Sequence, residues 1–247
     1  MPSGSGMDRR SFVRLCASAL AGISANPTVL AQPDARLRPY QRVRLVNDDD
    51  EPVTARQLAV GETFLFHYPF TATPCFLLNL GKPAQPVDLT TEKGQRYHWP
   101  GGTGPDRSIV AFSAICAHKM SYPTRSVSFI NYRHERVRFE NRAEQRTERS
   151  QVIFCCSEKS VYDPAAGAQV LGGPAKQPLA AIVLEESAND GALYAVGTFG
   201  GEMFDRFFRE FGFRLSLDLR TQDIRVPVAQ NATIVALADY CDNRIRC

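Results

Sequence analysis

Residues 152–175 read VIFCCSEKSVYDPAAGAQVLGGPA, and this stretch decides the fold of the chain. The apolar run 152–154 is typical of a short buried strand, and it leads directly into the adjacent residues Cys155 and Cys156. The glycines and proline at 172–174 mark a tight turn further along. The stretch therefore predicts β structure with cysteines at the end of a strand.

Short apolar runs bounded by Gly and Pro recur along the rest of the chain. Aromatic residues alternate with others from Phe64 to Phe70, as on a strand with one buried face. The pattern predicts strands at 64–70, 75–80, 108–112, 152–154, 181–185 and 192–196, a hairpin turn at 189–191, and loops at 32–60 and 81–107. This spacing predicts an all-β fold built as a small sandwich or barrel.

The composition excludes several classes of protein. The chain of 247 residues is 44% hydrophobic and 22% charged, which excludes a disordered chain. A net charge of +3 is too small to indicate a nucleic-acid partner. An apolar run long enough for a conventional membrane-spanning helix is absent from the sequence. Seven cysteines are too few for a disulfide scaffold.

Residues 1–31 are typical of a twin-arginine export signal. The pair Arg9-Arg10 precedes an Ala-rich, weakly apolar segment that ends at Ala31. The alternative is a short amphipathic first helix. An export signal predicts a periplasmic protein, with membrane contact only if the signal is retained as an anchor.

Two strands each run into a cysteine-bearing loop. Cys116 and His118 follow the strand expected at 108–112, and Cys155 follows the strand at 152–154. A Cys-x-His loop followed by a second cysteine-bearing loop has the spacing of ligands that hold a metal between two loops. Thiolate and imidazole ligands together are typical of zinc sites and iron–sulfur clusters. The alternative is that these are buried structural cysteines.

The residues after the second loop resemble a known family. Ser160-Val161-Tyr162-Asp163-Pro164, the Gly-Gly-Pro-Ala run at 172–175 and Pro178-Leu179 resemble the second cluster loop of Rieske [2Fe–2S] domains. The resemblance covers residues 60–200, and within the family the chain is most similar to the small Rieske subunit of arsenite oxidase.

The resemblance implies a ligand set for a [2Fe–2S] cluster. Cys116 and Cys155 would be the two thiolate ligands, and His118 would be one imidazole ligand. Backbone N–H groups of both loops would donate to the sulfur atoms. Ser160 would donate to a bridging sulfide and Tyr162 to a cysteine sulfur, as residues that support the cofactor.

The sequence departs from the family pattern in the second loop. Glu158 occupies the position of the second histidine, and Lys159 occupies the position of a glycine. The disulfide that joins the two loops in many Rieske domains is absent, because the matching positions are Ser121 and Ser157. Three alternatives follow: Cys156 is the fourth ligand, Glu158 is the fourth ligand, or no cluster binds. Either anionic ligand would lower the reduction potential relative to a cluster with two imidazoles.

The remaining segments extend this domain. Residues 32–59 form an N-terminal extension. Residues 119–153 form a charged insertion between the two loops. We expect this insertion to be solvated and to contain one helix, because its Glu and Arg residues recur every four positions. Residues 201–247 form a C-terminal extension in which the phenylalanines from Phe204 to Phe213 predict a short helix packed on the body. Cys241 and Cys247 are candidates for a local disulfide, and Cys75 is expected to lie in the core.

These observations predict a periplasmic Rieske-type iron–sulfur protein that transfers electrons as a subunit or partner of a larger oxidoreductase. The resemblance implies a redox partner protein, either a molybdenum-containing large subunit or a c-type cytochrome. The competing hypothesis is an interaction or scaffold subunit that has the Rieske fold and no cluster. A component of a ring-hydroxylating oxygenase is disfavoured by the export signal and by the absence of a non-haem iron triad.

Overall fold

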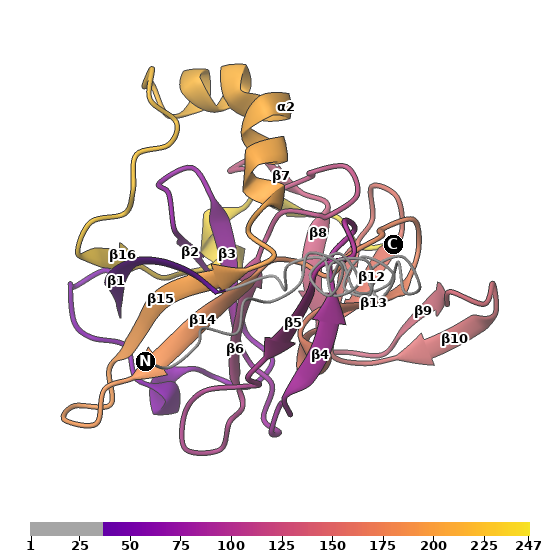
Figure 1. Ribbon diagram of the computed structural model, residues 1–247, viewed down its shortest axis with the longest axis horizontal. Coiled ribbons are helices and arrows are strands. Elements are labelled where there is room, and N and C mark those ends of the chain that lie inside the picture. Colours follow the sequence, from indigo (N-terminus) through magenta and orange to yellow (C-terminus); the bar gives the residue numbers. More distant parts are fainter. Residues whose placement is uncertain (1–36) are drawn as a thin grey trace, which may run out of the picture. The chain divides into compact units, whose positions relative to one another are not determined.

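The computed structural model describes residues 37–247. The expected export signal at 1–31 and the first residues of the N-terminal extension lie outside the described part. Over residues 37–247 the regular structure is mostly β-strand, so the all-β prediction is confirmed (Figure 1). Within this range, none of the helices has the length and apolar character that crossing a membrane requires.

The larger part of the core lies on an eight-stranded sheet. Its strand order is β16-β1-β15-β14-β6-β3-β2-β17. The strands are β1 (Arg38–Val46), β2 (Thr63–His67), β3 (Pro74–Asn79), β6 (Ile109–Ser113), β14 (Ala181–Glu186), β15 (Leu193–Phe199), β16 (Asn231–Thr233) and β17 (Val235–Ala236). Every residue of β6 is buried, and so are the first five of β3, because both strands are covered on their two faces. Cys75 lies in β3 and is fully buried, as expected of a core residue.

A second, four-stranded sheet carries the stretch that opened the sequence analysis. Its order is β13-β12-β11-β8. The strands are β8 (Ile130–Arg133), β11 (Val152–Cys155), β12 (Ser160–Asp163) and β13 (Gln169–Gly172). Alternation along β11 sends Val152 and Phe154 into a small outer cluster, whereas Ile153 and Cys155 enter the main core. The pleat of the strand therefore directs the sulfur of Cys155 inward.

Two segments expected to be loops contain strands. Residues 38–46 form β1, whose alternate side chains Val43 and Leu45 are fully buried while arginines occupy the other face. Within 81–107, β4 (Val87–Thr90) and β5 (Arg96–Trp99) pair as a hairpin. In both segments polar and apolar residues alternate, which is the pattern of a strand with one buried face, but the alternating runs are short and flanked by charged or Gly- and Pro-rich sequence.

The most charged part of the insertion forms a β-hairpin rather than the expected helix. The strands of this hairpin are β9 (Val137–Glu140) and β10 (Arg146–Arg149), and it projects beyond the four-stranded sheet (Figure 1). The insertion is not solvated throughout as expected, because β8 also belongs to it and Ile130 in that strand is fully buried. A four-residue recurrence of charge is also a multiple of the two-residue period of a strand, so the spacing did not distinguish the two structures. The side chain of Asn141 accepts from the N–H groups of Ala143 and Gln145, which stabilises the turn.

The C-terminal extension contains the expected helix, α2 (Met203–Asp218). Phe204, Phe207 and Phe208 are buried against the body, whereas Phe213 is 80% exposed and does not join them. The other elements of the described chain are short. They are the 3-10 helices η2 (Ala55–Gln57) and η3 (Pro164–Ala166), the helix α3 (Leu237–Tyr240), and the strands β7 (Val127–Ser128) and β18 (Asn243–Arg244), which pair in parallel.

Candidate functional site

The first cysteine lies in a loop that closes on itself. This segment, loop 1, comprises residues 114–126 between β6 and β7. The N–H of Cys116 donates to the carbonyl of Ser121 at 2.9 Å, and the N–H of Met120 donates to the carbonyl of Cys116 at 2.9 Å. Met120 takes a left-handed φ of 54°, which turns the chain back at this point. The loop thereby holds Cys116 inside and leaves His118 half-buried at its tip.

The second cysteine lies at the start of a tight hairpin. Loop 2, residues 156–159, joins β11 to β12. Lys159 takes a left-handed φ of 58°, at the position where the resembled family has glycine. Gly173 packs against this turn so closely that an added Cβ would lie 2.3 Å from the carbonyl oxygen of Lys159. The Gly-Gly-Pro turn therefore folds over loop 2, and only glycine fits at 173.

The two loops bring a pair of thiols together in the core. Cys116 and Cys155 are fully buried, and neither forms a disulfide. The S–H of Cys155 donates to the sulfur of Cys116, which lowers the pKa of Cys116 although burial acts in the opposite direction. The same contact, together with burial, raises the pKa of Cys155. Of the two thiols, Cys116 is therefore the one that loses its proton first as the pH rises.

Backbone amides face both sulfur atoms with the same spacing. In each loop, the N–H groups two and three residues after the cysteine donate to its sulfur; these belong to His118 and Lys119 for Cys116, and to Ser157 and Glu158 for Cys155. Amide donors stabilise negative charge on a thiolate. Both loops therefore present backbone N–H groups to a cysteine sulfur.

Three further polar side chains come from loop 1 and from β12, the strand that follows loop 2. The hydroxyl of Tyr162 lies 3.3 Å from the sulfur of Cys116, the contact expected of this residue, and accepts from the N–H of Ala117 at 3.2 Å. The hydroxyl of Ser160 is buried without any hydrogen-bond partner, and so is Nδ1 of His118. A buried polar atom without a partner is costly. These two atoms and the thiol pair fit a group that carries sulfur and accepts an imidazole ligand.

Cys156 is not available as the expected fourth ligand in this structure. Its sulfur is bonded to Cys247, which lies 91 residues later, with the two Cα atoms 5.7 Å apart. Cys155 ends β11 inside the core, whereas Cys156 is the first residue of the turn and is only half-buried. The same bond corrects the expected Cys241–Cys247 pair, because Cys241 is buried as a free thiol whose S–H donates to the carbonyl of Asn243 at 3.4 Å.

Glu158 lies on the outer side of loop 2. Its side chain is exposed and lines a groove between the β9–β10 hairpin and loop 2, together with Lys159 and Cys247. Among residues 37–247, no three side chains of the types His, Cys, Asp and Glu gather closely enough to hold a metal ion. The described structure therefore brings the thiols of Cys116 and Cys155 together. His118 follows Cys116 by two residues but does not complete a three-ligand group with the thiols, and the side chain of Glu158 is exposed.

The contact between loop 1 and helix α2 was not expected from the sequence. Arg206 donates to the carbonyl oxygen of His118 at 2.9 Å. The ring of Tyr122 packs edge-on against Phe207 and Phe211, at centroid distances of 5.0 and 5.4 Å. The aromatic pattern of the helix indicated a packed face, but no local signal indicated that this face covers a ligand loop.

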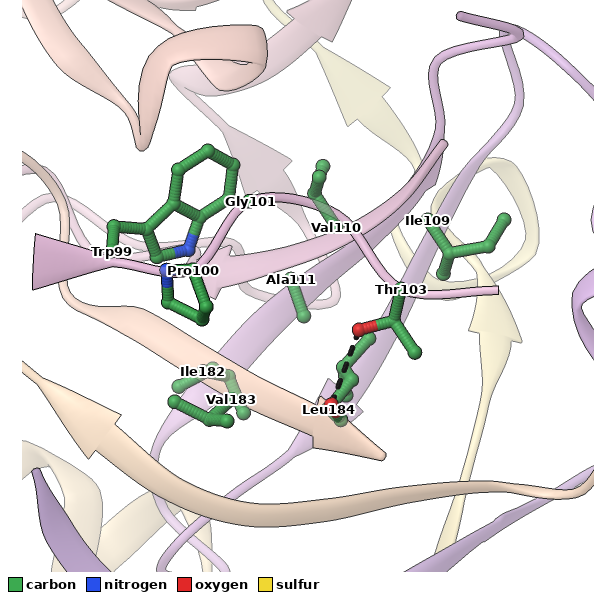
Figure 2. A pocket seen from close by; sticks show the side chains of 10 residues that line it. All are labelled: Trp99, Pro100, Gly101, Thr103, Ile109, Val110, Ala111, Ile182, Val183 and Leu184. Carbon is green, nitrogen blue, oxygen red and sulfur yellow. Dashed lines mark hydrogen bonds between the residues drawn. The ribbon is translucent and has the colours of Figure 1, made fainter. Parts of the chain in front are cut away.

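A cavity elsewhere in the core lacks comparable chemistry. It measures about 20 Å³ and lies where β5, β6 and β14 meet, between Trp99, Ile109 and Leu184 (Figure 2). The hydroxyl of Thr103 donates to the carbonyl of Leu184 at 3.1 Å, and the remaining lining is almost entirely apolar. This space is no larger than one water molecule, so it is no second candidate site.

The chain is similar in sequence and structure to a protein of known structure. No protein-family model matches the sequence. The chain is similar to the soluble domain of the Rieske protein II (soxF) from Sulfolobus acidocaldarius, with 26% sequence identity and a TM-score of 0.43. The match covers 64% of this chain and 78% of that chain.

Proposed function

We propose that this chain is a Rieske-type electron-transfer protein whose two loops hold a [2Fe–2S] cluster. The observation that carries the proposal is the pair of buried free thiols, each facing amides at the same spacing. In the same loop as Cys116, Nδ1 of His118 is buried without a hydrogen-bond partner. When bound, such a cluster accepts and releases one electron at a time.

Each residue of the site has a separate task in this proposal. Cys116 and Cys155 are the thiolate ligands, and Nδ1 of His118 is an imidazole ligand. The hydroxyl of Ser160 donates to a sulfide, and the hydroxyl of Tyr162 donates to the sulfur of Cys116. These donors and the loop amides stabilise added negative charge, so they favour the reduced state.

Glu158 is the proposed fourth ligand, since the disulfide occupies the sulfur of Cys156. It follows the Cys155 thiol by three residues, and loop 2 is exposed from Ser157 to Lys159, where a side chain can turn without displacing the core. A carboxylate in place of a neutral imidazole adds negative charge. The reduction potential is then lower than in a cluster with two imidazoles, and the pH dependence that a second imidazole would supply is absent.

We also propose the location and the partner that the sequence indicated. The twin-arginine signal favours the periplasm, and the Cys156–Cys247 disulfide is of the kind that persists in an oxidising compartment. The electron partner is a larger oxidoreductase subunit of the molybdenum type or a c-type cytochrome, as the family resemblance implies.

Counting iron tests this proposal directly. The full chain is purified without air, its iron and acid-labile sulfide are measured per chain, and the reduced form is examined by electron paramagnetic resonance. We expect two irons and two sulfides per chain, with loss of both in Cys116→Ser and Cys155→Ser, because each removes one thiolate of the pair. Cys75→Ala is the control and should retain the iron, since Cys75 lies in β3.

Two further results would decide the details. Glu158→Gln should alter the resonance spectrum and raise the potential, whereas an unchanged spectrum would exclude Glu158 as a ligand. Absence of iron in the parent protein would favour the second candidate function, a scaffold subunit without a cluster. The observation in favour of that alternative is that Glu158 lies outside the thiol site and that no three-ligand group is formed among the described residues.

A further inference from the structure

The last residues of the sequence bind both ligand loops. The segment Asp242–Cys247, which we call the C-terminal clasp, contains β18 and lies beside β7, with Asn243 opposite Val127 in the parallel ladder. On this side the clasp is held by main-chain hydrogen bonds. The N–H of Asp242 donates to the carbonyl of Arg125 at 2.8 Å.

Side chains extend the same contact. The side-chain amide of Asn243 donates to the carbonyl of Ser126 at 3.1 Å, and Ser126 is the last residue of loop 1. The side-chain amide of Asn131, in β8, donates to the carbonyl of Ile245 at 3.0 Å. The clasp is thereby attached to loop 1 and to the strand that pairs with the end of β11.

On its other side the clasp is attached covalently to loop 2. Cys247 is bonded to Cys156, the residue directly after the buried Cys155. Within loop 2, residues 157–159 are exposed, and the amides of Ser157 and Glu158 are the donors to the sulfur of Cys155. A crosslink at Cys156 restrains the backbone on which those donors depend.

We infer that Cys156 and Cys247 are positioning residues, and that their disulfide fastens the C-terminal clasp so that loop 2 keeps its amides directed at the sulfur of Cys155. The inference deepens the proposed function, since it assigns to the clasp the retention of the loop that would hold iron. Its physical basis is that a crosslink between distant residues removes open conformations of the loops it joins.

The Cys156–Cys247 disulfide can be broken by a reductant and formed again by an oxidant. Cys247 is exposed and lines the groove beside the β9–β10 hairpin, so a dithiol reductant can reach the bond. In that exchange the dithiol loses two electrons and two protons and becomes a disulfide, while the Cys156–Cys247 bond breaks and each sulfur gains one hydrogen. Oxidation by a disulfide reverses the same steps.

The test compares three variants of the full chain. Cys156→Ser/Cys247→Ser removes the crosslink and leaves no new thiol, Cys247→Ser leaves Cys156 free, and Cys241→Ser is the control because Cys241 is outside the bond. Hydrogen exchange is measured for the amides of Ser157 and Glu158, with those of the paired strands β3 and β6 as an internal reference. This readout is independent of whether iron is bound.

We expect exchange at Ser157 and Glu158 to accelerate at least about tenfold in the double variant and to remain at the parent rate in Cys241→Ser. Dithiothreitol should reproduce the acceleration in the parent protein, and reoxidation should reverse it. If iron is present, the double variant should also release it faster to a chelator and show a broadened resonance spectrum.

Equal exchange rates at these amides in the parent and the double variant, within about a factor of two, would overturn the inference. Absence of iron would overturn the proposed function alone, because the exchange comparison still decides the role of the clasp. A resonance spectrum that differs between Cys247→Ser and the double variant would show that a freed Cys156 becomes a ligand, which would contradict a positioning role confined to the disulfide.

Discussion

The two ligand loops are supported in different ways by the same C-terminal extension. Loop 1 lies under helix α2, where the ring of Tyr122 contacts Phe207 and Arg206 donates to the carbonyl of His118. Loop 2 has exposed residues at its tip and is attached to the C-terminal clasp through Cys156. One loop is held by apolar packing and the other by a covalent bond.

This difference shows that the extension is part of the site. Apolar packing over loop 1 depends on buried area, so it fails through loss of side-chain volume and is insensitive to reductant. A crosslink at loop 2 depends on sulfur chemistry, so it fails through reduction while the packing stays intact. The following changes test the packing of loop 1, the acid sensitivity near the clasp, and the polar contact at His118, in decreasing order of effect.

The largest expected effect comes from the packing over loop 1. Phe207→Ala should destabilise the protein by about 3–5 kcal/mol, because Phe207 is fully buried and contacts Tyr122 and other rings of α2. Urea unfolding followed by circular dichroism measures this change. Phe213→Ala is the matched control on the same helix and should cost less than about 0.5 kcal/mol, since Phe213 is 80% exposed. Similar losses in both variants would contradict the assigned packing.

The second largest expected effect is a loss of stability at low pH, caused by His67. Burial, and secondarily the charge of Arg125, lowers the pKa of His67 to about 4 from its ordinary value of 6.5. In the unfolded chain His67 therefore binds a proton below about pH 6.5, whereas in the folded chain it binds that proton only below about pH 4. Stability should fall by up to about 3 kcal/mol as the pH falls through this window.

His67→Gln tests this sign, because glutamine does not titrate. Denaturant unfolding at a series of pH values should show a weaker loss between pH 6.5 and 4 in this variant than in the parent. The ring of His67 lies 6.4 Å from that of Tyr240, two residues before the clasp. His98→Gln is the control, since His98 is exposed; an equal flattening in both variants would refute the assignment to His67.

The smallest expected effect concerns the polar contact to loop 1. Arg206→Ala should cost about 1 kcal/mol, because the hydrogen bond from its guanidinium to the carbonyl of His118 is partly exposed to solvent. Exchange at the amides of His118 and Lys119 should accelerate, while that of loop 2 should stay unchanged. Arg209→Ala, an exposed arginine on the same helix, should change neither. Faster exchange in loop 2 alone would reverse the comparison between the two loops.

Much of the site was predictable from spacing. Strand periodicity placed Cys155 at the end of a strand and Cys116 in the loop after one, and the family resemblance implied the contact from Tyr162. Less was predictable where one pattern fits two structures. The four-residue spacing of charges in the insertion fits a helix face and a strand face equally well, and the structure forms β9 and β10.

The disulfide shows what the sequence alone can predict and what depends on the tertiary structure. The sequence pattern predicts a strand that runs into Cys155 and Cys156, and alternation on an extended strand would send the two side chains to opposite sides. In the structure β11 ends at Cys155, which is buried, and Cys156 begins the turn. The local sequence does not identify the outer partner, and nearness in sequence favoured Cys241 for Cys247. Tertiary structure decides in favour of Cys156, 91 residues away, because β18 pairs with β7 and brings Cys247 to loop 2. Spacing along the chain thus identifies which sulfurs face inward, whereas the outer bond depends on contacts between segments that are distant in sequence.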